Sequence, residues 1–529
     1  MAVDHPATAI SPATPGTSRG SDPKWWTLGA VCLGTFMLLL DITVVNVALP
    51  AIQSALHSNF ADLQWVVDAY ALTLAALLLT AGSLADMYGR RLLYVIGLVL
   101  FTGASALCGL AQSPLMLELS RALQGVGGAV MFSVSLALLA NAFQGRERGT
   151  AFGVWGAITG IAVAIGPIVG GALVTGLSWR WIFFVNVPIG AGAVGLTLTR
   201  VVESRNPGAR RPDWLGFVLF TGGLTSLIYA LIESGLASFG ATRVVVAFAL
   251  AGVLLVAFVA AEARGRHPMF DLSLFRLPTF SGGSIAAFAI SASIFSLLLY
   301  LTLYLQDVLG YSALQTGLRL LVISGGILAV STVAGRLSSK VPVRYLIGPG
   351  LLAVGVGLLL MRGLTATSSW THLIPGLLVS GVGVGFVNPP LASTAVGVVE
   401  PQRSGMASGI NSTFRQVGIG TGIALLGTLF SSRLNSAVLQ RAAGTPFASH
   451  ATAIAAGLRN GNVGSEFAHV PAELRGILAG IVRGGFTSAL DEIFLVGAVI
   501  AFVGGALSLA LIRPKDFHPA AAGAPAGGH

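Results

Sequence analysis

The chain has 529 residues, of which 54% are hydrophobic and only 9% are charged, and its mean hydropathy is +0.83. Soluble domains usually carry about 25% charged residues, so this composition excludes a soluble globular protein. The net charge of +10 is spread over many short loops, which argues against nucleic-acid binding. The sequence therefore predicts an all-α, polytopic membrane protein.

The amino-terminal stretch 1–27 is polar and rich in Pro, Ser and Thr, and we predict a disordered tail there. It contains no short apolar run before a small-residue cleavage site, so no removable signal peptide is expected. A similar tail is predicted at 513–529. The only cysteines, Cys32 and Cys108, lie in apolar segments, and the histidines are scattered, so we predict neither a disulfide nor a metal site.

A membrane-spanning helix needs roughly 20 mostly apolar residues. We count fourteen such segments, and helices are expected because backbone groups in lipid must bond within the segment. The predicted spans are 28–50, 63–84, 92–111, 115–140, 151–175, 182–200, 214–233, 244–262, 279–303, 315–337, 346–363, 372–394, 404–431 and 490–512.

The distribution of Lys and Arg supports this count and sets the orientation. With fourteen spans, one side of the membrane holds 19 of these residues and the short loops of the other side hold 3. Positive residues mark the cytoplasmic side, so both termini are predicted in the cytoplasm of a bacterial cell. The segment 432–489 is too polar to span and is predicted to be an external loop, with 471–489 as an amphipathic helix on the protein or the bilayer.

Several ionisable side chains fall within predicted spans, and three of them are singled out here. Asp41 lies in the middle of the first span, Asp68 near the external end of the second, and Arg121 in the external half of the fourth, one turn after Glu118. A charge at the centre of a membrane helix costs about 2.5–3.5 kcal/mol even on lenient scales, so such residues usually have a function. A buried carboxyl whose access to Arg or water changes with conformation can take up and release a proton, and we predict this role here.

Two further segments of the chain are rich in glycine. The short loop after the second span contains Gly82, Asp86, Gly89, Arg90 and Arg91. The fifth span carries small residues at helical spacing and one proline, which permit close helix packing and bend the helix; these are Gly156, Gly160, Gly166, Pro167, Gly170 and Gly171.

These strings together resemble the major facilitator superfamily, and specifically its fourteen-helix drug:proton antiporters of the QacA/EmrB type. The first span resembles the Leu-Asp-x-Thr-Val-Val-Asn-Val-Ala-Leu-Pro signature of that branch. Residues 82–91 resemble the superfamily loop motif, 121–127 the proton-transfer motif, and 166–171 the antiporter motif. The strings 179–188, 304–306 and 411–416 also fit the branch. Departures are Met87, where a basic residue is usual, and Arg319, in a span without an acidic residue.

The resemblance implies a major facilitator fold of 6 + 2 + 6 helices. Its halves would be 28–200 and 279–512, with two helices inserted in 201–278. It further implies a proton-coupled multidrug exporter, acting as a monomeric antiporter without a cofactor, for small lipophilic and cationic compounds. An aromatic pocket would suit such substrates, and the candidates are Phe36, Trp65, Tyr70, Trp155, Tyr300, Tyr304 and Phe386.

Two alternatives remain open at this point. The first keeps the fold but changes the cargo to a lipid, an antibiotic or another metabolite. The second is a polytopic membrane protein that does not transport, such as a receptor or an enzyme. An enzyme would be expected to show clustered His, Asp or Glu at a membrane face, and the sequence has no such cluster or nucleotide-binding Gly-Lys-Ser/Thr loop.

Overall fold

The computed structural model describes residues 23–143, 145–205, 213–236, 239–265, 271–338, 341–399, 404–459 and 471–517. All regular secondary structure in these ranges is helical. The main helices are α1 (Pro23–Leu56), α2 (Phe60–Tyr88), α3 (Arg90–Gly109), α4 (Pro114–Ala142), α5 (Gly145–Gly176), α6 (Trp181–Phe184), α7 (Asn186–Arg200), α8 (Trp214–Leu236), α9 (Thr242–Arg264), α10 (Pro278–Ile290), α11 (Ser296–Leu303), α12 (Ala313–Leu337), α13 (Arg344–Leu360), α14 (Ile374–Gly397), α15 (Ser404–Ala442), α16 (Ala451–Arg459) and α18 (Ala472–Leu511).

All fourteen predicted spans are helical. Thirteen are long and apolar enough to cross a membrane, and the fourteenth is the shorter apolar helix α13. The sixth span is divided into α6 and α7. The ninth consists of α10 and α11 with two π-helical turns, η2 (Ser291–Phe295) and η3 (Tyr304–Val308), and such turns often mark functional sites.

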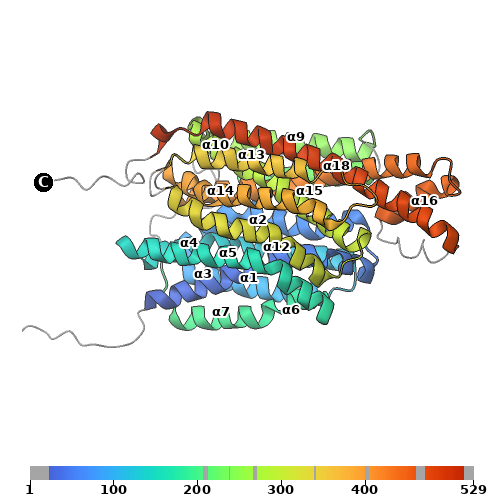
Figure 1. Cartoon of the computed structure of the whole chain (residues 1–529). Helices are drawn as coiled ribbons and strands as arrows, with labels where there is room; N and C mark the ends of the chain where they lie inside the picture. The colour runs from blue at the N-terminus through green and yellow to red at the C-terminus, as the bar shows by residue number, and fades with distance from the viewer. Residues whose placement is uncertain are drawn as a thin grey trace, which may run out of the picture.

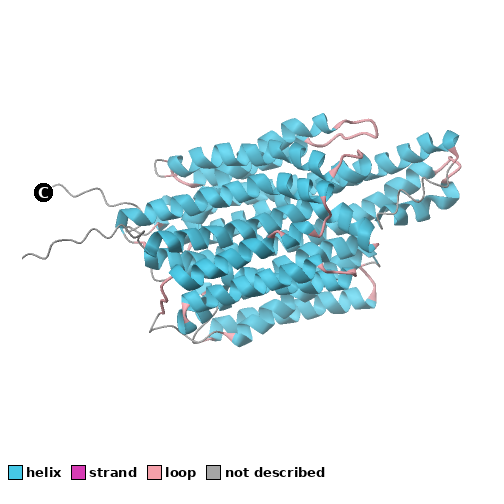
Figure 2. Ribbon diagram, turned by 90° about the horizontal axis from the view of Figure 1, so that it is seen from below, coloured by secondary structure: helices cyan, strands magenta, loops and turns pink. Residues whose placement is uncertain are grey.

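The spanning helices lie side by side along one long axis (Figures 1 and 2). We call the end of the bundle where α1 begins and α18 ends the terminal end, and the opposite end the far end (Figure 1). Helices α1–α7 form one half and α10–α18 the other. The inserted helix α8 packs against α2 of the first half and α15 of the second, while α9 packs on α8.

The two halves meet mainly along two helix pairs, α2 with α15 and α5 with α12, and α1 also packs against α11. Close contacts join them in the half of the bundle nearer the far end. Gln64 donates to the carbonyl oxygen of Ile423 (3.1 Å), and Gln306 donates to that of Val47 (2.8 Å). The amide of Leu314 donates to Thr175 Oγ1 (3.2 Å). These bonds close the interface at the far end.

The region 432–489 contains more helix than the external loop expected there, and the helix predicted over 471–489 is present as the first part of α18. Helix α15 continues to Ala442 and α18 already begins at Ala472, so both extend well past their spans and pack together with α16. We call this projection the arm; it stands out at the far end in Figure 1. Its polar residues face outward, while an apolar row packs inside and stabilises the helices; this row includes Leu434, Val438, Leu478, Val482 and Phe486.

The two tails also differ in part from expectation. Helix α1 begins at Pro23, inside the stretch 1–27, because Trp25, Trp26 and Thr27 continue the apolar helix outward. At the other end, Asp516 accepts a hydrogen bond from Thr279 (2.7 Å), so the start of 513–529 is docked on α10. Residues 1–22 and 518–529 lie outside the described part of the chain.

Candidate functional site

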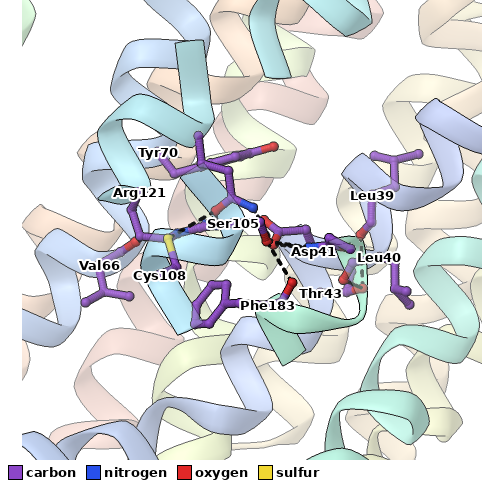
Figure 3. A network of polar contacts seen from close by, with 12 residues as sticks. Leu39, Leu40, Asp41, Thr43, Val66, Tyr70, Ser105, Cys108, Arg121 and Phe183 are labelled. Carbon is purple, nitrogen blue, oxygen red and sulfur yellow. Dashed lines mark hydrogen bonds and ion pairs between the residues drawn. The ribbon is translucent and has the colours of Figure 1, made fainter. Parts of the chain in front are cut away.

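Asp41 and Arg121 form a buried ion pair inside the first half (Figure 3). Arg121 Nη1 lies 2.6 Å from Asp41 Oδ2, and the two residues are 1% and 0% exposed. Arg121 is the largest of the fully buried side chains. Removing one partner of such a pair leaves an uncompensated buried charge, so the two residues depend on each other.

Amide side chains complete the coordination of Asp41. Gln124 Nε2 donates to Asp41 Oδ1 (2.8 Å) while its own oxygen accepts from Arg121 (2.7 Å). Asn186 Nδ2 donates to the same Asp41 oxygen (3.0 Å) and to Ser105 Oγ (3.0 Å). Both Asp41 oxygens are therefore bonded, and α1, α3, α4 and α7 are held together at this point.

Gln124, Asn186 and Ser105 were not predicted as site residues. Two of them were visible in the motifs already quoted. Gln124 lies three residues after Arg121, on the same helix face, and Asn186 lies within the string 179–188. Ser105 carried no signal of its own, because a serine in an apolar helix is most often a packing residue.

Arg121 also connects the ion pair to α2. Its Nε donates to the carbonyl oxygen of Val66 (3.1 Å), and its guanidinium lies over the ring of Tyr70, 4.2 Å from the ring centroid. Val66 is two residues before Asp68. The ion pair is thereby bonded to the backbone that carries the second buried acid.

Asp68 is 0% exposed, and neither of its carboxyl oxygens has a hydrogen-bond partner among the described residues. It lies on α2 where this helix packs against α15 and α8. A side-chain carbon added at Gly420 of α15 would lie 3.5 Å from Asp68 Oδ1 and 3.0 Å from Ile228 of α8. The carboxyl therefore occupies the interface between the halves, next to the inserted helix.

The loop motif is anchored by a residue that sequence reasoning missed. Gly89 has a φ of +121°, a conformation that favours glycine. The Glu203 carboxylate accepts hydrogen bonds from the backbone amides of Arg91 (2.9 Å) and Leu92 (3.1 Å), at the start of α3. An anion stabilises a helix amino terminus, so Glu203 joins α3 to the end of α7. The Asp86 side chain lies outside the described part.

The other loop residues have ordinary local roles. Gly82 lets α2 approach α4, since an added side-chain carbon would lie 2.7 Å from Ser133 Oγ. The amide of Arg90 donates to the carbonyl oxygen of Ser204 (3.0 Å), and the Arg91 side chain donates to that of Val201 (3.2 Å). Both bonds reach the segment after α7.

The glycines of α5 serve two different neighbours. Gly166 packs against Thr43 of α1, and a side-chain carbon at Gly170 would lie 3.0 Å from the backbone of Val44. Gly171 meets the backbone of α12 at Ala313 and Leu314, where an added carbon would lie at 2.6 Å. Pro167 presents its carbonyl oxygen to Gly317 of α12. The motif thus packs α1 within its half and closes the far end between halves.

The two remaining glycines of this motif are Gly156 and Gly160. A side-chain carbon at Gly160 would lie 3.4 Å from a Leu328 methyl group of α12, an ordinary contact. Gly156 is part of α5, but its surroundings are outside the description.

The aromatic candidates do not form one pocket in this conformation. Tyr300 and Tyr304 are 0% exposed and belong to an aromatic cluster with Phe60, Phe430 and Phe486 near the far end. Tyr300 donates to the Ile423 carbonyl oxygen (2.8 Å).

The other aromatic candidates are dispersed. Tyr70 is covered by Arg121, and Trp155 donates to Thr35 Oγ1 (3.0 Å), which joins α5 to α1. Trp65, Phe36 and Phe386 are partly buried. Trp65 packs in the apolar cluster around α8, whereas Phe36 packs in the main core.

Known proteins resemble this chain over most of its length. The family description of the Major Facilitator Superfamily matches residues 31–423. The Multidrug resistance protein Stp of Mycobacterium tuberculosis is 39% identical over 81% of this chain and 80% of its own length. The Puromycin resistance protein pur8 of Streptomyces alboniger is 36% identical over 80% of this chain and 85% of its own.

A solved structure shows the same fold. It is that of a bacterial homologue of the human lysosomal transporter Spinster, with a TM-score of 0.62 and 16% identity, covering 94% of this chain and 99% of the other. The family match and these relatives exclude the non-transporting alternative and indicate small-molecule substrates. The chain is therefore a multi-pass membrane protein, a transporter rather than an enzyme, and it belongs to the Major Facilitator Superfamily.

Proposed function

We propose that the protein exports small lipophilic compounds from the bacterial cytoplasm in exchange for protons, by alternating access between its two halves. The observation that carries this proposal is Asp68, a buried carboxyl without a hydrogen-bond partner at the interface that must open and close. The terminal end faces the cytoplasm, in keeping with the distribution of Lys and Arg. The far end, which is closed here, faces outward.

The two buried acids then have different tasks. Asp41 is fully bonded and stays paired with Arg121, so its role is to fix α1, α3, α4 and α7 in position. An unpaired, buried carboxylate is costly, so Asp68 holds a proton while the interface is closed. When the far end opens, water reaches Asp68 and the proton exchanges with the outside.

The energy source is the proton gradient alone, and no cofactor is required. Each charge that crosses the membrane contributes about 2.3 kcal/mol per 100 mV. Gln64 lies one turn from Asp68 on α2 and bonds to α15, so the step that opens the far end also uncovers the carboxyl. Lipophilic, cationic compounds fit this scheme because a cation and a proton compete for one ionised Asp68. We propose that the protein works as a monomer surrounded by membrane lipid.

The test uses the full-length protein in liposomes with an imposed pH gradient and ethidium as the substrate. Asp68→Asn keeps the shape of the protonated acid, so we expect proton-driven efflux to fall to background. Glu118→Gln is the matched control, since Glu118 is a partly buried acid outside the Asp41 network, and it should transport normally. Proton-driven efflux by Asp68→Asn at the unchanged rate would remove Asp68 from the mechanism.

A narrow exporter of one antibiotic or other metabolite is the second candidate. The relatives favour it in part, because one is named for resistance to the single compound puromycin. Resistance of cells producing the protein to a panel of unrelated compounds would separate the two, since a narrow exporter protects against one chemical class.

A further inference from the structure

Arg415 is a second intramembrane arginine that the proposed proton pathway does not use. It lies in α15, where its Nη2 donates to Asn388 Oδ1 of α14 (3.1 Å). Arg121 is neutralised by Asp41, whereas no acidic side chain pairs with Arg415 in the described part of the chain. A guanidinium in this setting retains donors and charge that an amide oxygen cannot satisfy.

The contacts of α15 show which way this side chain faces. On one side, Gly418 and Gly422 approach the backbone of α10 and η2 in the same half. On another side, Thr413 and Gly420 meet α2 of the opposite half. At 100° per residue, Arg415 falls at the edge of the α15 face between these contacts. Arg415 is partly buried at this edge, where it bonds to Asn388 of α14.

The helix that carries Asn388 contains two prolines at the same level. Pro389 and Pro390 follow immediately inside α14, and each removes a backbone hydrogen bond, which leaves polar carbonyl oxygens near the middle of this helix. The substrate sites of secondary transporters lie near the middle of the membrane. The Arg415–Asn388 pair is therefore at a position suited to contact a transported molecule.

We propose that Arg415, held by Asn388, binds a hydrogen-bond-acceptor oxygen of the substrate, such as a carboxylate or an ionised phenol. This inference rests on the proposed export function and deepens it, because it gives the second half a site opposite in charge to Asp68. A guanidinium presents a planar fork of donors that matches such oxygens, and its bonds are charge-assisted. The exporter would then accept anionic and zwitterionic lipophilic compounds, and not cations alone.

The test measures dye binding to the purified, full-length protein by fluorescence anisotropy, without a proton gradient. Fluorescein and rhodamine 123 share a ring skeleton and carry opposite charges. We expect the wild type to bind both dyes. Arg415→Gln should weaken fluorescein binding about tenfold or more while leaving rhodamine 123 within about twofold. Arg415→Lys, which keeps the charge without the fork, should give an intermediate loss.

A second variant keeps the arginine in place. Asn388→Asp would supply the missing carboxylate and occupy Arg415 internally, so it should weaken fluorescein binding to a similar extent. Arg319→Gln is the matched control, because Arg319 also lies in a spanning helix but stacks on Tyr311, 3.6 Å from the ring centroid. It should leave both affinities unchanged.

Two results would overturn the assignment. One is a wild type that does not bind fluorescein. The other is an equal loss of both dyes in Arg415→Gln and Asn388→Asp, with both proteins eluting as folded monodisperse species. Failure of proton coupling would appear instead in the ethidium efflux assay, which this binding measurement does not involve.

Discussion

The two buried aspartates of the first half lie in opposite kinds of environment. Asp41 accepts bonds from Arg121, Gln124 and Asn186, whereas neither oxygen of Asp68 has a partner among the described residues. Asp41 lies within one half, and Asp68 lies between the halves. The difference teaches that burial alone does not identify a proton carrier, because a carboxylate with every bond satisfied has little reason to change its state.

The largest difference between the two aspartates is expected in folding stability. Asp41→Asn leaves Arg121 buried without a counter-charge and should cost about 3–5 kcal/mol of folding free energy. Asp68→Asn removes no bond and should change stability by less than about 0.5 kcal/mol. Denaturant titration of both purified variants beside the wild type checks this. A larger loss in Asp68→Asn than in Asp41→Asn would reverse the two roles.

A smaller effect is expected for Arg121→Lys. The lysine keeps the positive charge beside Asp41 but cannot also donate to the carbonyl oxygen of Val66, so the link to α2 is lost. We expect proton-driven ethidium efflux to fall about tenfold, while Asp41 stays paired and the protein remains folded. Unchanged efflux would show that the link from the ion pair to α2 has no part in coupling.

The variant Gln64→Leu tests whether the bond from α2 to α15 near Asp68 keeps the far end closed. The substitution removes the bond from Gln64 to Ile423, and one hydrogen bond is worth about 1 kcal/mol, or about a fivefold shift toward the open far end. Spin labels at the exposed residues Gln112 and Ser369, one in each half, would report the shift as a longer distance. The native cysteines are both buried, which keeps background labelling low. Gln112 and Ser369 distances identical to the wild type would contradict the assignment.

The smallest effect is expected at the terminal end, far from either aspartate. Glu203→Gln removes the charge that caps α3, and such a charge is worth about 0.3–1 kcal/mol. Thermal unfolding should therefore show a slight loss of stability with ethidium efflux unchanged. A loss of efflux without a loss of stability would mean that this cap takes part in transport.

Most of the fold could be predicted because membrane helices are recognisable in a sequence by their length and apolarity, as the fourteen spans show. The arm could not be found in this way, since Ser432, Arg433 and Ser436 give it the composition of a loop. Its apolar residues recur at helical spacing, for example Leu434, Val438 and Ala442, and this pattern predicts two packed helices. Only the second of these helices was predicted, as the amphipathic helix 471–489, because overall apolarity does not reveal the part of the arm formed by α15.

Of the residues in the candidate site, only the charged ones could be predicted from the sequence. Asp41, Asp68 and Arg121 are conspicuous because charge is rare in apolar runs. Which of them pair depends on how α1, α2 and α4 are placed in three dimensions. In the sequence, Asp41 and Asp68 are both acidic residues in apolar spans, and nothing there shows which of them has a partner. In the structure, Asp68 lies where α2 packs against α15 and has no hydrogen-bond partner among the described residues.

The arm has a mechanical consequence. Helix α15 runs unbroken for 39 residues, about 58 Å at 1.5 Å per residue, and its contact with Asp68 at Gly420 lies near its middle, about 33 Å from its outer end. It is therefore a lever, and any tilt at the interface is magnified at its end. In the proposed orientation, with the far end facing outward, an antibody fragment that clamps the tip would resist that tilt and would arrest transport from outside the cell.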